Sequence, residues 1–250
     1  MPIADPEVLA DGPAVAEWVA ARLLQARLDH PELPLGLATG RTMEPVYGAL
    51  VGRVRAWPQP RQQTLRDHWC SFNLDEYVGL GPGDPDSFAA FMDRQLAAPL
   101  GLERARLQLP DGLASDPSLE ARRYGAALAA AGGIGLQLLG LGLNGHIGFN
   151  EPPCGAETRS RCVTLSASTR AQNAGAFGGS PQAVPAQALT LGLVEILAAR
   201  EILLVVTGAA KAPVLQRLLQ DPPGPQLPAS WLHLHPAVTL VVDRAAWGRG

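Results

Sequence analysis

The sequence predicts an α/β protein with one open, mostly parallel sheet and helices on both of its faces, a Rossmann-like arrangement. Segments with apolar residues at helical spacing alternate with short apolar runs along the chain. These runs are continuously apolar, which is typical of strands covered on both faces. Because the sequence has no internal repeat and no inter-domain linker, we expect a single domain over residues 1–250.

The expected elements follow one another in the order that βαβ units require. The expected strands are Leu35–Ala38, Trp69–Leu74, Leu136–Leu141, Glu201–Thr207 and Val238–Asp243. The expected helices are residues 13–29, Met43–Trp57, Ser87–Leu100, Leu119–Ala131, Leu189–Leu197 and Ala210–Gln220. Two proline-rich stretches, residues 58–60 and 222–228, are short enough to be loops.

Composition argues against several other classes of protein. Hydrophobic residues make up 47% of the chain and charged residues 17%, which does not fit a disordered protein. Twenty basic residues against 23 acidic ones give a net charge of −3, so we expect no nucleic-acid partner. The three cysteines form no disulfide framework, which favours a reducing compartment.

Targeting and metal patterns are also missing from the sequence. The first twelve residues have neither the basic nor the apolar region of a signal peptide, and charged or amide side chains interrupt every long apolar run. We therefore expect a cytoplasmic protein without a membrane partner. His233 and His235 share a strand-like segment, but no third ligand has the spacing of a metal site, so no metal is expected.

Polar or glycine-containing segments follow four of the predicted strands. They are Thr39–Thr42, Asp75–Tyr77, Gly142–His146, and Thr207–Gly208 with Lys211 shortly after it. Ligands of open α/β sheets bind outside the carboxyl ends of the strands. We therefore expect these segments to converge on one rim of the sheet.

Two of these segments are suited to an anion. Thr39–Thr42 forms a strand-to-helix turn with hydroxyl groups and backbone N–H groups at a helix start, although glycine is also common in such turns for the turn alone. Lys211 lies in the first turn of a predicted helix, where its charge opposes the helix dipole. A bound anion would compensate for that; a solvated lysine is the alternative.

The other two segments are suited to proton transfer. Asp75 and Glu76 lie at a strand end, where a carboxylate near an apolar pocket can serve as a general base; a solvated capping turn is the alternative. Gly142–Pro152 contains His146 and Glu151, which can form a proton-relay pair. The alternative is a glycine-rich loop around a buried histidine.

Taken together, these segments resemble the glucosamine-6-phosphate deaminase family, also called glucosamine-6-phosphate isomerase, and in particular its shorter bacterial branch. The matching stretches are LGLATGRT at 35–42, FNLDEYVGL at 72–80, SFAAFM at 87–92, LQLLGLGLNGHIGFNEP at 136–152, TRSRCVTL at 158–165, VPAQALTLG at 184–192, VTGAAKA at 206–212 and LHLHP at 232–236. The related 6-phosphogluconolactonases share the fold but not the FNEP ending of the fourth long motif.

The resemblance implies an enzyme of amino-sugar metabolism and N-acetylglucosamine catabolism. It implies hydrolytic deamination of glucosamine 6-phosphate to fructose 6-phosphate and ammonia, with no organic cofactor and no metal. It also implies a monomer or a small homo-oligomer whose only partner is the sugar phosphate. Alternatives are a sibling enzyme acting on galactosamine 6-phosphate or 6-phosphogluconolactone, and a non-catalytic sugar-phosphate sensor.

The resemblance also assigns roles to residues of this chain. It implies that Asp75 is the enolisation base, that His146 accepts the ring-opening proton, and that Glu151 fixes the histidine tautomer. Asn144 occupies the third ring-opening position, where other members have Asp; asparagine can orient His146 but cannot stabilise an imidazolium by charge. The substrate phosphate is assigned to the turn and the lysine described above: Thr39, Gly40, Arg41, Thr42 and Lys211.

The chain departs from the family pattern at three positions. Gly175 stands where members usually have an arginine that binds phosphate, and Arg41 stands where they usually have glycine. Val163 replaces a lysine that the longer branch uses for allosteric activation, and the long C-terminal tail of that branch is not present. We expect Arg41 to replace the missing phosphate arginine, and we expect no allosteric activation.

Overall fold

The main sheet has seven parallel strands, and it appears in a computed structural model that describes residues 3 and 5–248. In spatial order they are β1 (Glu7–Leu9), β10 (Val238–Asp243), β9 (Glu201–Val206), β6 (Leu136–Gly140), β2 (Leu35–Leu37), β3 (Ser71–Asn73) and β5 (Leu107–Gln108). The central strands β6, β2 and β3 are almost wholly buried, as their apolar sequences predict. The predicted fold class is confirmed.

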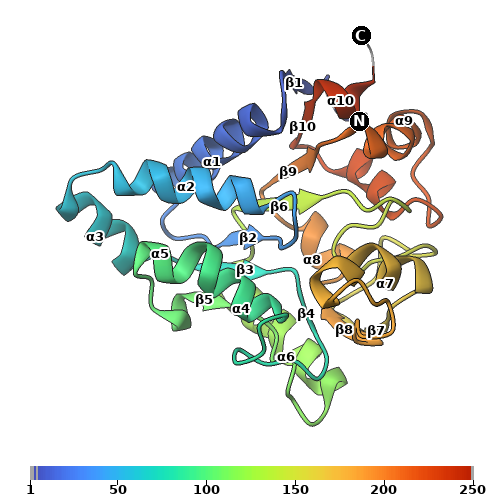
Figure 1. The fold of residues 1–250 in the computed structure, drawn as a ribbon, viewed down its shortest axis with the longest axis horizontal. Coiled ribbons are helices and arrows are strands. Elements are labelled where there is room, and N and C mark those ends of the chain that lie inside the picture. The colour runs from blue at the N-terminus through green and yellow to red at the C-terminus, as the bar shows by residue number, and fades with distance from the viewer. Residues whose placement is uncertain (1–2, 4, 249–250) are drawn as a thin grey trace.

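Helices cover both faces of this sheet. Helices α1 (Gly12–Asp29) and α2 (Glu44–Arg55) lie together on one side, and α6 (Pro117–Ala130) and α8 (Leu193–Leu197) lie on the other (Figure 1). Helix α1 begins one residue before its predicted start at position 13. The Asp11 side chain caps it by accepting from the backbone N–H of Ala14, and a proline follows in the first turn. The other helical segments are α3 (Gln59–His68), α4 (Phe88–Met92), a π-helical turn (Asp93–Ala97), α5 (Ala98–Leu100), α7 (Ala167–Asn173), α9 (Ala212–Gln220), α10 (Arg244–Trp247) and 3-10 turns at Arg104–Arg106, Ala174–Phe177, Ala209–Lys211 and Pro228–Leu234.

The strand order creates one switch point. From β2 the chain passes through α2 to β3, its neighbour on one side, whereas from β6 it passes to β9 on the other side. Because parallel crossovers are right-handed, the two connections cover opposite faces of the sheet. A crevice therefore opens outside the carboxyl ends of β2 and β6, where open α/β sheets bind their ligands.

A second, antiparallel sheet lies beside the first. Its strands are β4 (Asp75–Tyr77), β8 (Gln187–Thr190) and β7 (Arg161–Thr164), in the order β4-β8-β7 (Figure 1). A small apolar cluster packs against it, made of Tyr77, Phe149, Leu165, Ala174, Val184 and Ala188.

Two predicted elements are wrong. Residues 189–197 do not form one helix, because Gln187–Thr190 is strand β8 and only Leu193–Leu197 is helical. Asp75–Tyr77 is not a turn after a strand but is itself strand β4, since its backbone pairs with β8. The proline-rich stretch 58–60, expected as a loop, instead contains the start of helix α3 at Gln59.

Among the described residues, no helix is both long and apolar enough to cross a bilayer.

Candidate active site

Asp75 is fixed at the switch point by its neighbour in the chain. The backbone N–H of Leu74 donates to the carbonyl of Leu37, the last residue of β2, at 3.0 Å, and the carbonyl of Leu74 accepts from Leu191 at 2.7 Å. The chain therefore passes from the main sheet into strand β4 of the second sheet at the point where β2 ends. The Asp75 side chain is only 6% exposed, so this carboxyl group is buried in the crevice.

The carboxyl group of Asp75 lies against the glycine-rich loop. A Cβ atom on Gly148 would be 3.6 Å from Oδ2 of Asp75. Burial, together with the charge of Glu76, raises the pKa of Asp75 to about 8. No described residue donates a hydrogen bond to its oxygens, so both remain available to a substrate.

Glu76, the other carboxylate of this segment, has a structural role. Its oxygens accept from the backbone N–H groups of Tyr77 at 2.8 Å, Phe88 at 2.9 Å and Ala89 at 2.7 Å. These bonds cap the start of α4. Of the two carboxylates, Asp75 is thus the one free to act on a substrate.

His146 is held by the residue two positions before it. Its Nδ1 lies 2.6 Å from Oδ1 of Asn144, which also accepts from the His146 backbone N–H at 3.2 Å. An amide oxygen only accepts, so Nδ1 carries the proton and Nε2 is left as a proton acceptor. Gly142 makes room for the ring, since a Cβ atom there would lie 2.3 Å from ring atoms. The sequence-based expectation that Glu151 fixes this tautomer is wrong, because Asn144 does so.

Glu151 points to other partners. Its carboxylate accepts hydrogen bonds from Ser166 and Thr169. Burial raises the pKa of Glu151, but these bonds and nearby His146 outweigh burial and hold the pKa below its usual value. Glu151 is therefore an anion beside the imidazole.

The imidazole itself is neutral near pH 7. Burial lowers the pKa of His146 to about 4; the charge of Glu151 opposes this decrease and that of Lys211 adds to it. All three groups are thus close enough to influence one another. The sequence-predicted residues Asn144, His146, Glu151 and Lys211 are brought together.

The turn after β2 presents backbone N–H groups that no described residue accepts from. Gly40 has a positive φ of 105°, which glycine adopts without strain. Among the described residues, none accepts from the backbone N–H groups of Gly40, Arg41 or Thr42. Helix α2, which follows, has no side-chain cap at its start. These are the features of an anion-binding turn.

Two cations flank this turn. Lys211 donates from Nζ to the carbonyl of Leu141 at 2.7 Å, which holds the lysine at the end of β6. Burial and the charge of Arg41 both lower the pKa of Lys211, so the two cations are close to each other. Arg41 is exposed and makes no hydrogen bond or ion pair with the part of the chain that the structure describes. Gly175 lies in the 3-10 turn after α7, and a Cβ atom there would meet nothing within 4 Å.

Several residues that support the site were not predicted from the sequence. Asn150 is fully buried and pins the glycine-rich loop, because its Nδ2 donates to the carbonyls of Ile147 at 3.0 Å and Leu191 at 2.9 Å. Ser166 and Thr169, which bind Glu151, were also missed. A serine or threonine at a helix start is a recognisable cap, but its contact with a residue 15 or more positions away has no local signature.

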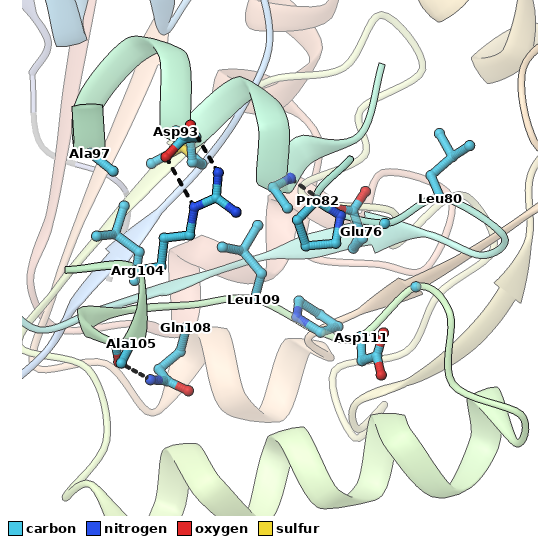
Figure 2. Close-up of a pocket in the computed structure, with 16 residues that line it drawn as sticks. Glu76, Leu80, Pro82, Asp93, Ala97, Arg104, Ala105, Gln108, Leu109 and Asp111 are labelled. Carbon is cyan, nitrogen blue, oxygen red and sulfur yellow. Dashed lines mark hydrogen bonds and ion pairs between the residues drawn. The ribbon is translucent and has the colours of Figure 1, made fainter. Parts of the chain in front are cut away.

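A separate cavity borders strand β4 at Glu76. Its volume is about 290 Å³, and Glu76, Pro82, Leu109 and Asp111 are among its lining residues (Figure 2). Arg104 and Asp93 form an ion pair at 3.2 Å in its wall (Figure 2). Of the candidate site residues only Glu76 lines this cavity; Asp75, His146, Glu151, Lys211 and the Thr39–Thr42 turn do not, so it is distinct from the crevice.

Within the described residues, no group of three or more His, Cys, Asp or Glu side chains is arranged to hold a metal ion. The ionisable groups in the crevice are instead one carboxylic acid, one imidazole, one carboxylate and two cations. This set is suited to proton transfer on an anionic substrate.

The fold and the crevice define an α/β enzyme of the Rossmann-like class, with acid–base side chains beside a cationic turn. The family described as glucosamine-6-phosphate isomerases/6-phosphogluconolactonase matches residues 4–241, and the chain belongs to this family.

Curated relatives cover nearly the whole chain. The chain is 45% identical over 240 residues to a glucosamine-6-phosphate deaminase of Rhodopirellula baltica, covering 96% of this chain and 93% of the relative. It is 39% identical over 239 residues to a glucosamine-6-phosphate deaminase of Streptomyces coelicolor, with coverage of 96% and 90%.

Solved structures agree with this assignment. One described as a monomeric glucosamine-6-phosphate deaminase has a TM-score of 0.90 and 35% identity, and the match covers 97% of this chain and 99% of that one. A 6-phosphogluconolactonase from Trypanosoma cruzi has a TM-score of 0.75 at 18% identity, with coverage of 99% and 97%. At that identity, the second match shows the fold alone.

Proposed function

We propose that the protein converts glucosamine 6-phosphate and water into fructose 6-phosphate and ammonia. The observation that carries the proposal is the meeting of Asp75, His146 and the cationic turn at one switch point. Such a crevice offers separate groups for opening a sugar ring, for moving a proton between carbons and for binding a phosphate. The names of the curated relatives support the choice of this substrate.

Ring opening is assigned to His146. Nε2 of the neutral imidazole takes the proton of the anomeric hydroxyl group, the C1–O5 bond breaks, and the imidazolium returns this proton to O5, which gives the open-chain aldehyde. Asn144 keeps Nδ1 protonated throughout, so the reactive nitrogen stays Nε2. Glu151 stabilises the imidazolium that forms, because Asn144 has no charge to contribute.

Isomerisation is assigned to Asp75. Its carboxylate removes the proton from C2 while the ammonium group gives a proton to O1, which forms the enolamine. Protonated Asp75 then gives its proton to C1, which leaves a ketimine. Water adds at C2, and ammonia leaves to give the ketone. Asp75 must be ionised for the first step, and the cationic amino group on C2 favours that form. Positioned proton transfers of this kind contribute about 10²–10⁴-fold each to the rate.

The phosphate group is assigned to Thr39, Gly40, Arg41, Thr42 and Lys211. The unpaired backbone N–H groups and the two neighbouring cations support this assignment. The 6-phosphate then lies at the carboxyl end of β2, at a distance from the carbons that react.

We extend the proposal to the cellular role and the oligomeric state of the protein. It makes the protein a hydrolase of N-acetylglucosamine catabolism, working in the cytoplasm as one domain over residues 1–250. A solved relative described as monomeric supports a monomer.

An ammonia-release assay tests the proposed function. Glucosamine 6-phosphate should be the best substrate, ahead of galactosamine 6-phosphate, N-acetylglucosamine 6-phosphate and unphosphorylated glucosamine. A preference for galactosamine 6-phosphate, or hydrolysis of 6-phosphogluconolactone, would make the protein a sibling enzyme. Tight binding of these sugars without turnover would indicate a sensor.

A further inference from the structure

We propose that Thr169 and Ser166 are positioning residues that hold the Glu151 carboxylate ionised beside His146. The inference rests on the proposed function, in which His146 becomes an imidazolium during ring opening. It adds Ser166 and Thr169, two residues to which the sequence assigned no role.

Three hydrogen bonds connect the two residues to Glu151. Oε2 of Glu151 accepts from the Ser166 backbone N–H at 2.8 Å, and Oε1 accepts from the Ser166 hydroxyl at 2.5 Å. The Thr169 hydroxyl donates to the same Oε1. Thr169 is only 1% exposed, so water cannot easily replace its hydroxyl group.

The imidazolium of His146 needs a charged Glu151 because the side chain at position 144 is neutral. Asn144 orients the His146 ring but cannot stabilise a positive charge on it. The positive charge of Lys211 disfavours protonation of the His146 ring, and the negative charge of Glu151 favours it. The stabilisation of the imidazolium therefore depends on Glu151 staying charged in a partly buried place, which hydrogen-bond donors make possible.

Thr169 is a cleaner target than Ser166. The Ser166 hydroxyl also accepts from the Thr169 backbone N–H at 3.2 Å, so it caps α7 as well. The Thr169 hydroxyl bonds to Glu151, and α7 has other anchors: Arg170 donates to the carbonyl of Val184 at 3.1 Å and Asn173 to the Tyr77 hydroxyl at 3.0 Å. Removing the Thr169 hydroxyl should therefore leave α7 in place.

The test compares three variants and one double variant by steady-state kinetics on glucosamine 6-phosphate. Thr169→Val keeps the shape of the side chain but removes the donor, and Thr169→Ser keeps the donor. We expect Thr169→Val to lower kcat by roughly ten- to a hundredfold, as for loss of a charge-assisted hydrogen bond, with KM changed less than about threefold. Thr169→Ser should keep most of the activity.

The double variant separates positioning from an independent effect. If Thr169 acts through Glu151, adding Thr169→Val to Glu151→Gln should cause little further loss. Two results overturn the inference without contradicting the proposed function. In the first, the losses in kcat of the two single variants multiply in the double variant. In the second, Thr169→Val has full activity although Glu151→Gln has lost most of its kcat. If Glu151→Gln itself keeps normal kcat, there is no charge to position, and the role of Glu151 in the proposed function fails too. Thermal unfolding of each variant checks folding, and Thr169→Ala replaces Thr169→Val if valine prevents it.

Discussion

Asp75 combines burial with the chemistry assigned to it, and this makes its amide variant informative. Asp75→Asn keeps the shape of the side chain but cannot accept the C2 proton. We expect kcat to fall by at least about a hundredfold while KM changes little, given the usual size of general-base effects. Single-turnover kinetics and substrate binding by calorimetry measure the two quantities. A variant that keeps more than about a hundredth of the wild-type kcat contradicts the assignment.

The same substitution should stabilise the protein at high pH. The pKa of Asp75 is about 8 in the folded protein against 3.8 for an ordinary aspartate, so the unfolded chain releases this proton first. Stability is therefore lost as the pH rises from about 4 to 8, by roughly 1.4 kcal/mol per pH unit for this one group. Asn does not titrate and removes that loss.

Thermal unfolding of both proteins at pH 5 and pH 8 measures this effect. The advantage in Tm of Asp75→Asn should be small at pH 5 and larger at pH 8. Glu76, whose pKa burial raises to about 7, titrates in the same direction but is present in both proteins. An advantage independent of pH would mean that Asp75 is ionised in the free protein.

Arg41 is expected to replace the phosphate arginine that Gly175 lacks. A guanidinium group can bond two phosphate oxygens at once, and Arg41 lies close to Lys211. Arg41→Ala should raise KM for glucosamine 6-phosphate by roughly ten- to a hundredfold, with a smaller effect on kcat because the phosphate is remote from C1 and C2. Steady-state kinetics measure both constants.

Two further variants show whether a change in KM is specific to the phosphate site. Arg122→Ala, which removes an exposed arginine from α6, is the matched control and should leave KM unchanged. Gly175→Arg in the Arg41→Ala background should recover much of the loss, since position 175 has open space around it. An unchanged KM in Arg41→Ala would mean that Lys211 and the backbone N–H groups bind the phosphate without Arg41.

Among single residues, the sequence predicted the location of the site better than its contacts. The segments around Asp75, His146 and Lys211 do meet, because strand ends of a parallel sheet share one edge. Their catalytic roles remain predictions. The tautomer of His146 was assigned to Glu151 and only its orientation to Asn144, whereas Asn144 forms the bond to the ring that decides both. Such pairings depend on loop conformation, which residue types alone do not determine.

At the level of elements, strands β2 and β6 approach closely at Gly36, which gives a stability prediction. A Cβ atom on Gly36 would lie 2.3 Å from Oε1 of Gln137. Gln137 is fully buried, and its Nε2 donates to the carbonyl of Leu138 at 2.9 Å, so the side chain has little freedom to move away. Gly36→Ala should therefore destabilise the fold by about 1–3 kcal/mol, as overpacking does.

Gly48→Ala is the matched control, since it is the same substitution at an exposed position of helix α2, with nothing within 4 Å of the added Cβ atom. It should stabilise the protein by roughly 0.5–1 kcal/mol, because alanine restricts the unfolded chain and favours a helix. Urea unfolding gives both free energies. Destabilisation by the two variants alike would show that the contact with Gln137 is not the cause.

The elements that the sequence missed have physical reasons in common. Helix α3 buries only Gln62 and Leu65, so its sequence lacks apolar residues at helical spacing. The prolines near its start are also typical of a loop, although proline is common in the first turn of a helix. Strands β4 and β8 are three and four residues long and pair across more than a hundred positions of chain. Local patterns identify the long, buried elements, whereas short strands exist only through distant partners.

For the whole molecule, the sequence predicted the layer architecture because the buried strands and amphipathic helices that build it are local features. The second sheet was not predicted, yet it carries Asp75 and packs beside the glycine-rich loop. A single domain over residues 1–250 remains a prediction.

The last prediction concerns the kinetics of the whole protein. Val163 lies in β7 where the longer branch of the family has a lysine used for activation, so this position offers no positive charge to a second sugar phosphate. If the protein is also a monomer, no neighbouring subunit can change its affinity. We therefore expect hyperbolic dependence on glucosamine 6-phosphate, with a Hill coefficient of about 1, and no activation by N-acetylglucosamine 6-phosphate. Initial-rate curves with and without that sugar, together with light scattering at the assay concentration, measure both properties. A sigmoidal curve that becomes hyperbolic when the sugar is added would show that a second site and a second conformation exist despite Val163.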